Sequence, residues 1–349
     1  MVICNMRSAK NLLVNMDLLK DISVYFNINY KWIYTYDYAP DAVWEPWRAN
    51  VYGDKGEGTP AWIDEEAAAV AERVCKGILT YILLADSHFT YNGTWDDTVA
   101  SMRALTEKLP IDGLIHLGDL TDGLLPIAKT NEIERQCIED MQRLGAPVYI
   151  VPGNHDYNYF RGNPEIRYPS TPQYYIDEPG QKLRLIFLDS FDPKEELRYG
   201  FTEYCIHWTE SVLHMMPKDY VAIIFSHVPP IKQLHAWSDW IRNSHILMLV
   251  LDKYADRILA YINGHSHCDH LFNGLHNGQF PIISINCAKC EYFLEHKPEG
   301  AVVPYRRLGD RTQESFDIMQ VDTEKREIYF TRFGAGQDRI VRNHKAEWV

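Results

Sequence analysis

From residue 78 onward, short apolar runs alternate with segments of helical periodicity, and this alternation predicts an α/β domain. The apolar runs predict strands over residues 78–85, 114–117, 148–151, 183–188, 221–225 and 258–262. The periodic segments predict helices over residues 95–108, 130–144, 202–216 and 246–256. A further helix is expected between Thr59 and Gly77, because its first turns are acidic and a glycine ends it.

The two ends of the chain follow a different pattern. After residue 270 the helical period disappears, and strands are expected over 280–285, 316–321 and 328–333, the last two forming a hairpin. Every even position from 22 to 38 is apolar or aromatic, which predicts an extended segment with one buried face. That segment either packs on the domain body or serves as a ligand platform, a lid or a dimer contact. We expect residues 1–77 to form an N-terminal extension and residues 78–349 to form the main domain.

Polar motifs follow several of the predicted strands directly. In α/β sheets, ligands bind beyond the carboxyl ends of the strands, so the sequence predicts that these motifs converge. The motifs are Asp86-Ser-His88, Gly118-Asp119, Gly153-Asn154-His155-Asp156, Ser226-His227 and Gly264-His265-Ser-His267.

The side chains of these motifs form a mixed set of nitrogen and oxygen donors without a thiolate, which argues against a closed structural zinc site. Imidazole and carboxylate together suit first-row ions, namely manganese, iron, zinc, nickel or cobalt. One ion does not need so many ligands, so the set predicts two divalent or trivalent ions that share a carboxylate. Two ions about 3.5–4 Å apart would hold a bridging hydroxide that attacks phosphorus in line.

The order and spacing of these motifs resemble those of the calcineurin-like metallophosphoesterase family, in its cyclic-nucleotide phosphodiesterase-like branch. The resemblance implies the metallo-dependent phosphatase fold, a four-layer sandwich of two mixed β-sheets flanked by helices. His88 stands where purple acid phosphatases carry glycine, and no tyrosine follows Asp119 by three residues. These two differences favour the phosphodiesterase and repair-nuclease branches. The Asp86-x-His88 pattern also favours a diester substrate over a monoester.

The resemblance also implies a role for each residue of the set. Asp119 would bridge the two ions. His155 would donate a proton to the leaving oxygen or stabilise the transition state, and Asp156 would orient the His155 imidazole through a hydrogen bond. The remaining ligands would be Asp86, His88 and His267 on the first ion, and Asn154, His227 and His265 on the second.

Composition narrows the choice of substrate and compartment. The 349 residues are 46% hydrophobic and carry a formal net charge of -13, which repels phosphate backbones and disfavours a nuclease. The 7 scattered cysteines indicate reduced thiols, and we interpret Cys287 and Cys290 as packed thiols rather than half of a zinc site. We find neither a secretory segment nor an apolar run that could span a bilayer, so a cytoplasmic protein without membrane partners is expected.

Substrate contacts are expected in the loops that follow the motifs. Tyr157 and Arg161 follow the Gly153 motif, and Trp237 lies between His227 and His265, although these side chains could equally serve packing. The sequence predicts a dinuclear metal-dependent phosphoester hydrolase, a phosphodiesterase acting on a small soluble substrate. The alternatives are a phosphomonoesterase or nuclease of the same family, or a non-catalytic scaffold of the same fold. The sequence leaves the substrate and the oligomeric state open.

Overall fold

A computed structural model describes residues 52–53, 56–75, 77–89, 94–121, 123, 127–156, 173–192, 199–237, 240–274 and 280–349, and the structural statements that follow concern these residues. The predicted aromatic segment 22–38 and the predicted contacts Tyr157 and Arg161 lie outside them. The division of the chain at residue 77 stays a prediction.

The larger sheet of the described residues has 7 strands in the order β15-β14-β13-β12-β2-β3-β4. Strands β2, β3 and β4 run parallel, whereas β12 to β15 are antiparallel and join the sheet along β2. The strands are β2 (Leu79–Leu84), β3 (Gly113–His116), β4 (Val148–Ile150), β12 (Ser315–Asp322), β13 (Glu327–Gly334), β14 (Arg339–Arg342) and β15 (Lys345–Trp348).

The smaller sheet has 6 strands in the order β5-β6-β7-β8-β10-β9. Strands β6, β7, β8 and β10 run parallel, and β5 and β9 are antiparallel edge strands. The strands are β5 (Tyr174–Glu178), β6 (Leu183–Leu188), β7 (Val221–Ser226), β8 (Ile258–Asn263), β9 (His270–Phe272) and β10 (Ile282–Ser284); a separate pair joins β1 (Tyr52–Gly53) to β11 (Arg307–Leu308).

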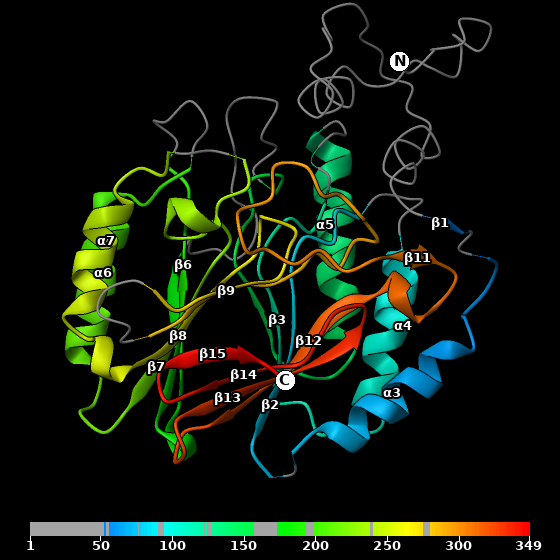
Figure 1. Ribbon diagram of the computed structural model, residues 1–349, viewed down its shortest axis with the longest axis horizontal. Coiled ribbons are helices and arrows are strands. Elements are labelled where there is room, and N and C mark those ends of the chain that lie inside the picture. Colours follow the sequence, from blue (N-terminus) through cyan, green and yellow to red (C-terminus); the bar gives the residue numbers. More distant parts are fainter. Residues whose placement is uncertain are drawn as a thin grey trace, which may run out of the picture.

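The two sheets face each other, and helices cover their outer faces (Figure 1). Helices α3 (Trp62–Arg73), α4 (Trp95–Thr106) and α5 (Ile127–Gln142) pack on the larger sheet. Helices α6 (Glu203–Met215) and α7 (Ser244–Asp252) pack on the smaller sheet. The predicted sandwich of two mixed sheets flanked by helices is therefore confirmed. None of the described helices is long and apolar enough to cross a membrane.

Strand periodicity explains these layers. In β2, Tyr81 and Leu83 point into the apolar layer between the sheets, while Ile82 and Leu84 pack beneath the helices on the outer face. Strands β6 and β7 divide their side chains in the same way, so both faces of each central strand are buried. This double burial produces the continuous apolar runs by which the sequence predicts the strands.

Sequence reasoning missed the short strands β14 and β15, which pair across a turn with positive φ at Asn343 and His344. One of their inward positions is occupied by Arg339, which ion pairing keeps buried. A charged residue at a buried position breaks the apolar–polar alternation by which a strand is predicted from the sequence. The predicted helix over 246–256 was wrong at its end. Helix α7 stops at Asp252, and a short 3-10 turn buries Ala255 before β8 begins.

A buried ion network ties the last strands to the chain that follows His267. Arg332 on β13 donates to Asp269 at 2.5 Å and lies 3.2 Å from Asp317 on β12. Arg339 on β14 contacts both carboxylates, and all four side chains are at most 2% exposed. Removing one partner of such a network leaves an uncompensated buried charge, which is strongly destabilising.

The buried carboxyl of Glu314 gives the fold a pH dependence. Burial raises the pKa of Glu314 from 4.5 to about 7, although Thr98 donates a hydrogen bond to it at 2.7 Å. The native state holds this proton more tightly than the unfolded state does. The unfolding free energy should therefore fall by up to about 3 kcal/mol as the pH rises from 4.5 to 7.

We expect the Glu314→Gln variant to lose this part of the pH dependence. Its unfolding free energy relative to wild type should rise as the pH increases from 4.5 to 8, and urea titrations at several pH values measure the difference. Parallel pH profiles for the two proteins would contradict this account.

Candidate metal centre

The predicted motifs converge where strands of both sheets end. The metal-ligand candidates of the larger sheet follow β2, β3 and β4, and those of the smaller sheet follow β7 and β8. The residues brought together are Asp86, His88, Asp119, Asn154, His155, Asp156, His227, His265 and His267. Apart from His155, each is at most 6% exposed.

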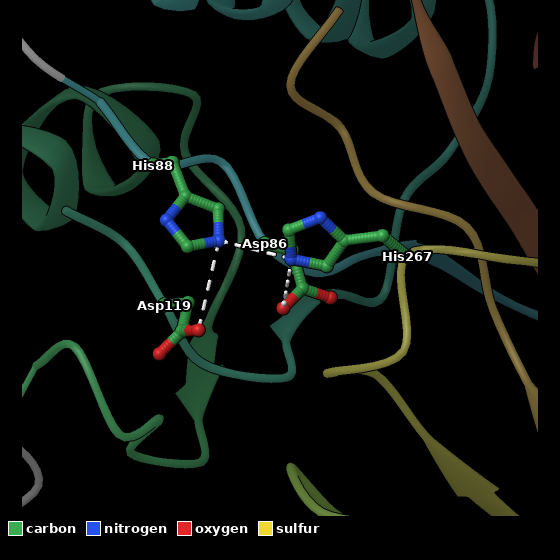
Figure 2. Close-up of side chains that lie close together, drawn as sticks. All are labelled: Asp86, His88, Asp119 and His267. Atoms are coloured by element: carbon green, nitrogen blue, oxygen red, sulfur yellow. Dashed lines mark hydrogen bonds and ion pairs between the residues drawn. The ribbon is translucent and has the colours of Figure 1, made fainter. Parts of the chain in front are cut away.

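A first group of donors consists of Asp86, His88, Asp119 and His267, shown in Figure 2. Their donor atoms lie within 4.8 Å of one another. His88 Nε2 is 3.1 Å from His267 Nε2 and 3.6 Å from Asp119 Oδ2, and His267 Nε2 is 3.4 Å from Asp86 Oδ1. Nitrogen and oxygen donors at these separations suit a metal ion bound among them.

A second group consists of Asp119, His227 and His265, and it shares Asp119 with the first. His227 Nε2 lies 3.1 Å from His265 Nδ1 and 3.3 Å from Asp119 Oδ2. The side-chain oxygen of Asn154 lies 3.1 Å from the same nitrogen. The other ring nitrogen of His227 is 2.6 Å from the carbonyl oxygen of Leu117. That bond places a proton on Nδ1 and turns Nε2 toward Asp119 and Asn154.

Tight turns aim these side chains back over the strand ends. Positive φ angles occur at Asp86, His88, Asp119, His265 and His267, a conformation that non-glycine residues rarely adopt. Such turns bring backbones so close together that only glycine fits between them. A Cβ on Gly153 would lie 2.2 Å from the backbone nitrogen of Asp119, and one on Gly118 would lie 2.5 Å from that of Gly153.

The charges of the site are strongly coupled. Burial disfavours the ionised form of Asp119, yet His227 and His155 hold its pKa well below the ordinary range. Burial also opposes the charge on His227, but Asp119 raises the pKa of that imidazole to about 9. Burial, reinforced by His235 and His227, keeps the pKa of His265 well below 6.5. The site thus combines ionised carboxylates with imidazoles, the donor chemistry that suits first-row metal ions.

The carboxylate of Asp156 has different partners from those predicted. Instead of the His155 imidazole, it accepts backbone N–H bonds at 2.8 Å from Asp119, Leu120 and Gly153. Burial and the charge of Asp119 raise its pKa to about 7. Asp156 therefore joins the turn after β3 to the turn after β4, and it acts on the site through the backbone.

His155 and Trp237 lie at the border of the donor cluster. The imidazole of His155 is 12% exposed, and its Nε2 lies 3.9 Å from Asp119 Oδ2. The indole N–H of Trp237 donates to the carbonyl oxygen of His265 at 3.0 Å, and its ring stacks on Phe293. Contact of Trp237 with a substrate stays a prediction.

Sequence reasoning missed Glu291, whose carboxylate lies 3.0 Å from His267 Nδ1. The pattern that identified the other motifs, a strand followed by polar residues, also occurs here. The predicted strand 280–285 is followed by polar residues that include Lys289 and Glu291. Strand β10 is parallel to β8, so the chain that follows it emerges at the same edge of the sheet.

Comparison with known proteins identifies the family. Residues 79–269, more than half of the chain, match the family model for calcineurin-like phosphoesterases. The chain belongs to the calcineurin-like phosphoesterase family. The match covers all of the predicted motifs and ends before the strands β9 to β15.

Among curated proteins, the chain is similar to a probable glycerophosphodiester phosphodiesterase, GpdQ, of Arcobacter nitrofigilis. The two are 31% identical over 171 residues, which cover 45% of this chain and 56% of that protein. The chain thus matches little more than half the length of this curated relative.

Solved structures share the fold of this calcineurin-like phosphoesterase. A dimetal phosphatase from Danio rerio aligns with 76% of this chain and 99% of its own, at 15% identity and a TM-score of 0.59. Purple acid phosphatase PPD1 from yellow lupin aligns with 78% of this chain and 53% of its own, at 10% identity and a TM-score of 0.53. At these identities, the two structures support the fold alone.

We expect the Asp156→Ala variant to be much less stable than Asp156→Asn. Alanine leaves the backbone N–H groups of Asp119, Leu120 and Gly153 without their acceptor, at roughly 1–3 kcal/mol each. Asparagine keeps one acceptor oxygen. Urea unfolding of the metal-free proteins should show a loss of at least about 3 kcal/mol for alanine and a smaller loss for asparagine. Equal losses would contradict the backbone role of Asp156.

Proposed function

We propose that this calcineurin-like phosphoesterase is a dinuclear metal-dependent phosphodiesterase that acts on a small substrate. The observation that carries the proposal is the buried set of converging donors, in which Asp119 belongs to two groups at once. A carboxylate common to two sets of imidazoles suits a pair of ions. The completeness of the set also argues against a non-catalytic scaffold.

In this proposal each donor group holds one ion. Asp86, His88 and His267 belong to the first site, while Asn154, His227 and His265 belong to the second, with Asp119 between them. Manganese, iron, zinc, nickel or cobalt would suit these ligands. When bound, the two ions would supply the positive charge and the activated water that phosphoester hydrolysis requires.

The remaining roles fall to side chains beside the donors. His155 is partly exposed and stands next to the shared carboxylate, where it can reach a substrate oxygen. We assign it the transfer of a proton to the leaving group or the stabilisation of the transition state. Asp156 would support it indirectly, since the backbone N–H of His155 donates to Asp119 Oδ1 at 2.8 Å in the turn that Asp156 holds.

Two observations favour a small diester as the substrate. The GpdQ relative is described as a probable glycerophosphodiester phosphodiesterase. The net charge of -13 disfavours long nucleic acids, whose phosphates the protein surface would repel. We therefore propose a small-molecule phosphodiester as the partner, a cytoplasmic location, and substrate contacts from Tyr157, Arg161 and Trp237.

Hydrolysis of bis(p-nitrophenyl) phosphate and of p-nitrophenyl phosphate, with added Mn²⁺, tests the activity. We expect turnover of the diester to exceed that of the monoester, to disappear after chelation and to return with Mn²⁺. Preference for the monoester would replace the diesterase assignment with a phosphomonoesterase. Protein that binds two ions and hydrolyses neither compound would contradict a generic phosphodiesterase site.

The Asp119→Ala variant should lose metal and activity together, because Asp119 serves both donor groups. Metal content after chelation and reconstitution with Mn²⁺ measures the first loss. The exposed Asp96→Ala variant is the matched control and should bind as wild type does. Two tightly bound ions in Asp119→Ala would contradict the bridging role.

The His155→Ala variant should keep both ions and lose about 10²–10⁴-fold in kcat for the diester. His207→Ala, an exposed histidine on α6, should leave kcat unchanged. Wild-type kcat in His155→Ala would remove His155 from the reaction, whereas loss of metal would reassign it as a ligand.

A further inference from the structure

The chain that follows β10 reaches the first donor group from outside the family match, which ends at residue 269. The backbone N–H of Ala288 donates to the carbonyl oxygen of Ala85 at 2.7 Å. The backbone N–H of Lys289 donates to the carbonyl oxygen of Asp86 at 3.2 Å. These bonds hold the strand end at which Asp86 takes a positive φ. The same loop therefore supports the backbone of one donor of the first group.

The carboxylate of Glu291 supports a second donor. Glu291 Oε1 lies 3.0 Å from His267 Nδ1, at hydrogen-bonding distance, and the two side chains are 2% and 4% exposed. The proton of His267 is thereby placed on Nδ1, so the lone pair of Nε2 points toward Asp86 and His88 (Figure 2). A carboxylate on the outer nitrogen also makes the imidazole a stronger ligand.

The side chain of Lys289 lies beside the other oxygen of the Glu291 carboxylate. Its Nζ lies 3.5 Å from Glu291 Oε2, and its side chain is 3% exposed. A cation bound by His267, Cys287 and Glu291 is the alternative for this cluster. The ammonium beside Glu291 disfavours a second positive charge there.

We propose that Glu291 is a positioning residue for the first metal site, acting through His267 and balanced by Lys289. This inference rests on the proposed two-metal site. It predicts that a change at Glu291 weakens metal binding at the first site and not at the second, because no contact of Glu291 in the described structure reaches His227 or His265. Loss of a carboxylate behind a metal-binding histidine weakens metal binding by about 10–100-fold.

The test measures Mn²⁺ binding to chelator-stripped protein by calorimetry. His265→Ala isolates the first site, and His88→Ala isolates the second. Adding Glu291→Gln should weaken Mn²⁺ binding about 10-fold in the His265→Ala protein and less than about twofold in the His88→Ala protein. Adding Glu291→Ala, which removes the acceptor altogether, should weaken the first site by up to about 100-fold. The exposed Glu295→Gln, in the same loop, is the control and should change neither affinity.

Thermal midpoints of the metal-free proteins separate positioning from folding. A purely structural role would lower the midpoint and weaken both sites together, which would overturn the proposal. The double variant Glu291→Gln/Lys289→Met removes both members of the buried ion pair and should still show the selective loss at the first site.

The remaining outcomes are equally decisive. Equal affinities with and without Glu291→Gln would overturn the positioning role alone. A third ion in wild-type protein that disappears in Glu291→Gln would overturn it in favour of a metal site at His267, Cys287 and Glu291. Wild-type protein that binds no Mn²⁺ would overturn both this inference and the two-metal proposal.

Discussion

The candidate metal centre depends on chain reversals that few backbone conformations allow. Asp86, His88, Asp119, His265 and His267 all take positive φ, at a cost of roughly 1–3 kcal/mol each. Strain of this size persists only where neighbouring groups fix the backbone from several sides. Asp156 supplies three such bonds, and the carbonyl oxygens of Gly118 and Asp119 accept bonds from the backbone N–H groups of Asp86 and His88. The positions of the donors are therefore fixed by backbone hydrogen bonds.

The same turns place opposite charges where burial would otherwise neutralise them. Asp119 stays ionised because imidazoles surround it, and His227 holds its proton because Asp119 is near. A similar balance recurs at Glu291 between His267 and Lys289, and at Asp269 between two arginines. Because Asp269 lies two residues after His267, the arginines of β13 and β14 also anchor the loop that carries His265 and His267.

Much of this arrangement could be predicted from the sequence, because buried parallel strands are apolar on both faces and their ends carry the motifs. The strands around Leu83, Ile115, Phe187 and Ile223 follow from that rule. Strand β14 does not, since ion pairing buries Arg339 in a position where an apolar side chain is expected. The partners of Asp156 were missed because they are backbone N–H groups, which nearly every residue carries and which the sequence therefore cannot distinguish. Glu291 was missed because its role depends on β10 lying parallel to β8.

The position of β12 has a consequence for how the protein is made. Strand β2 lies inside its sheet, between β3, which soon follows it along the chain, and β12, which follows only after the parallel strands of both sheets. During translation, the segment carrying Asp86 and His88 thus emerges long before its second neighbouring strand. Such pairing between distant segments slows folding, because a long loop must close first. The strand end that carries Asp86 and His88 therefore gains its second neighbour only after the parallel strands of both sheets have been synthesised.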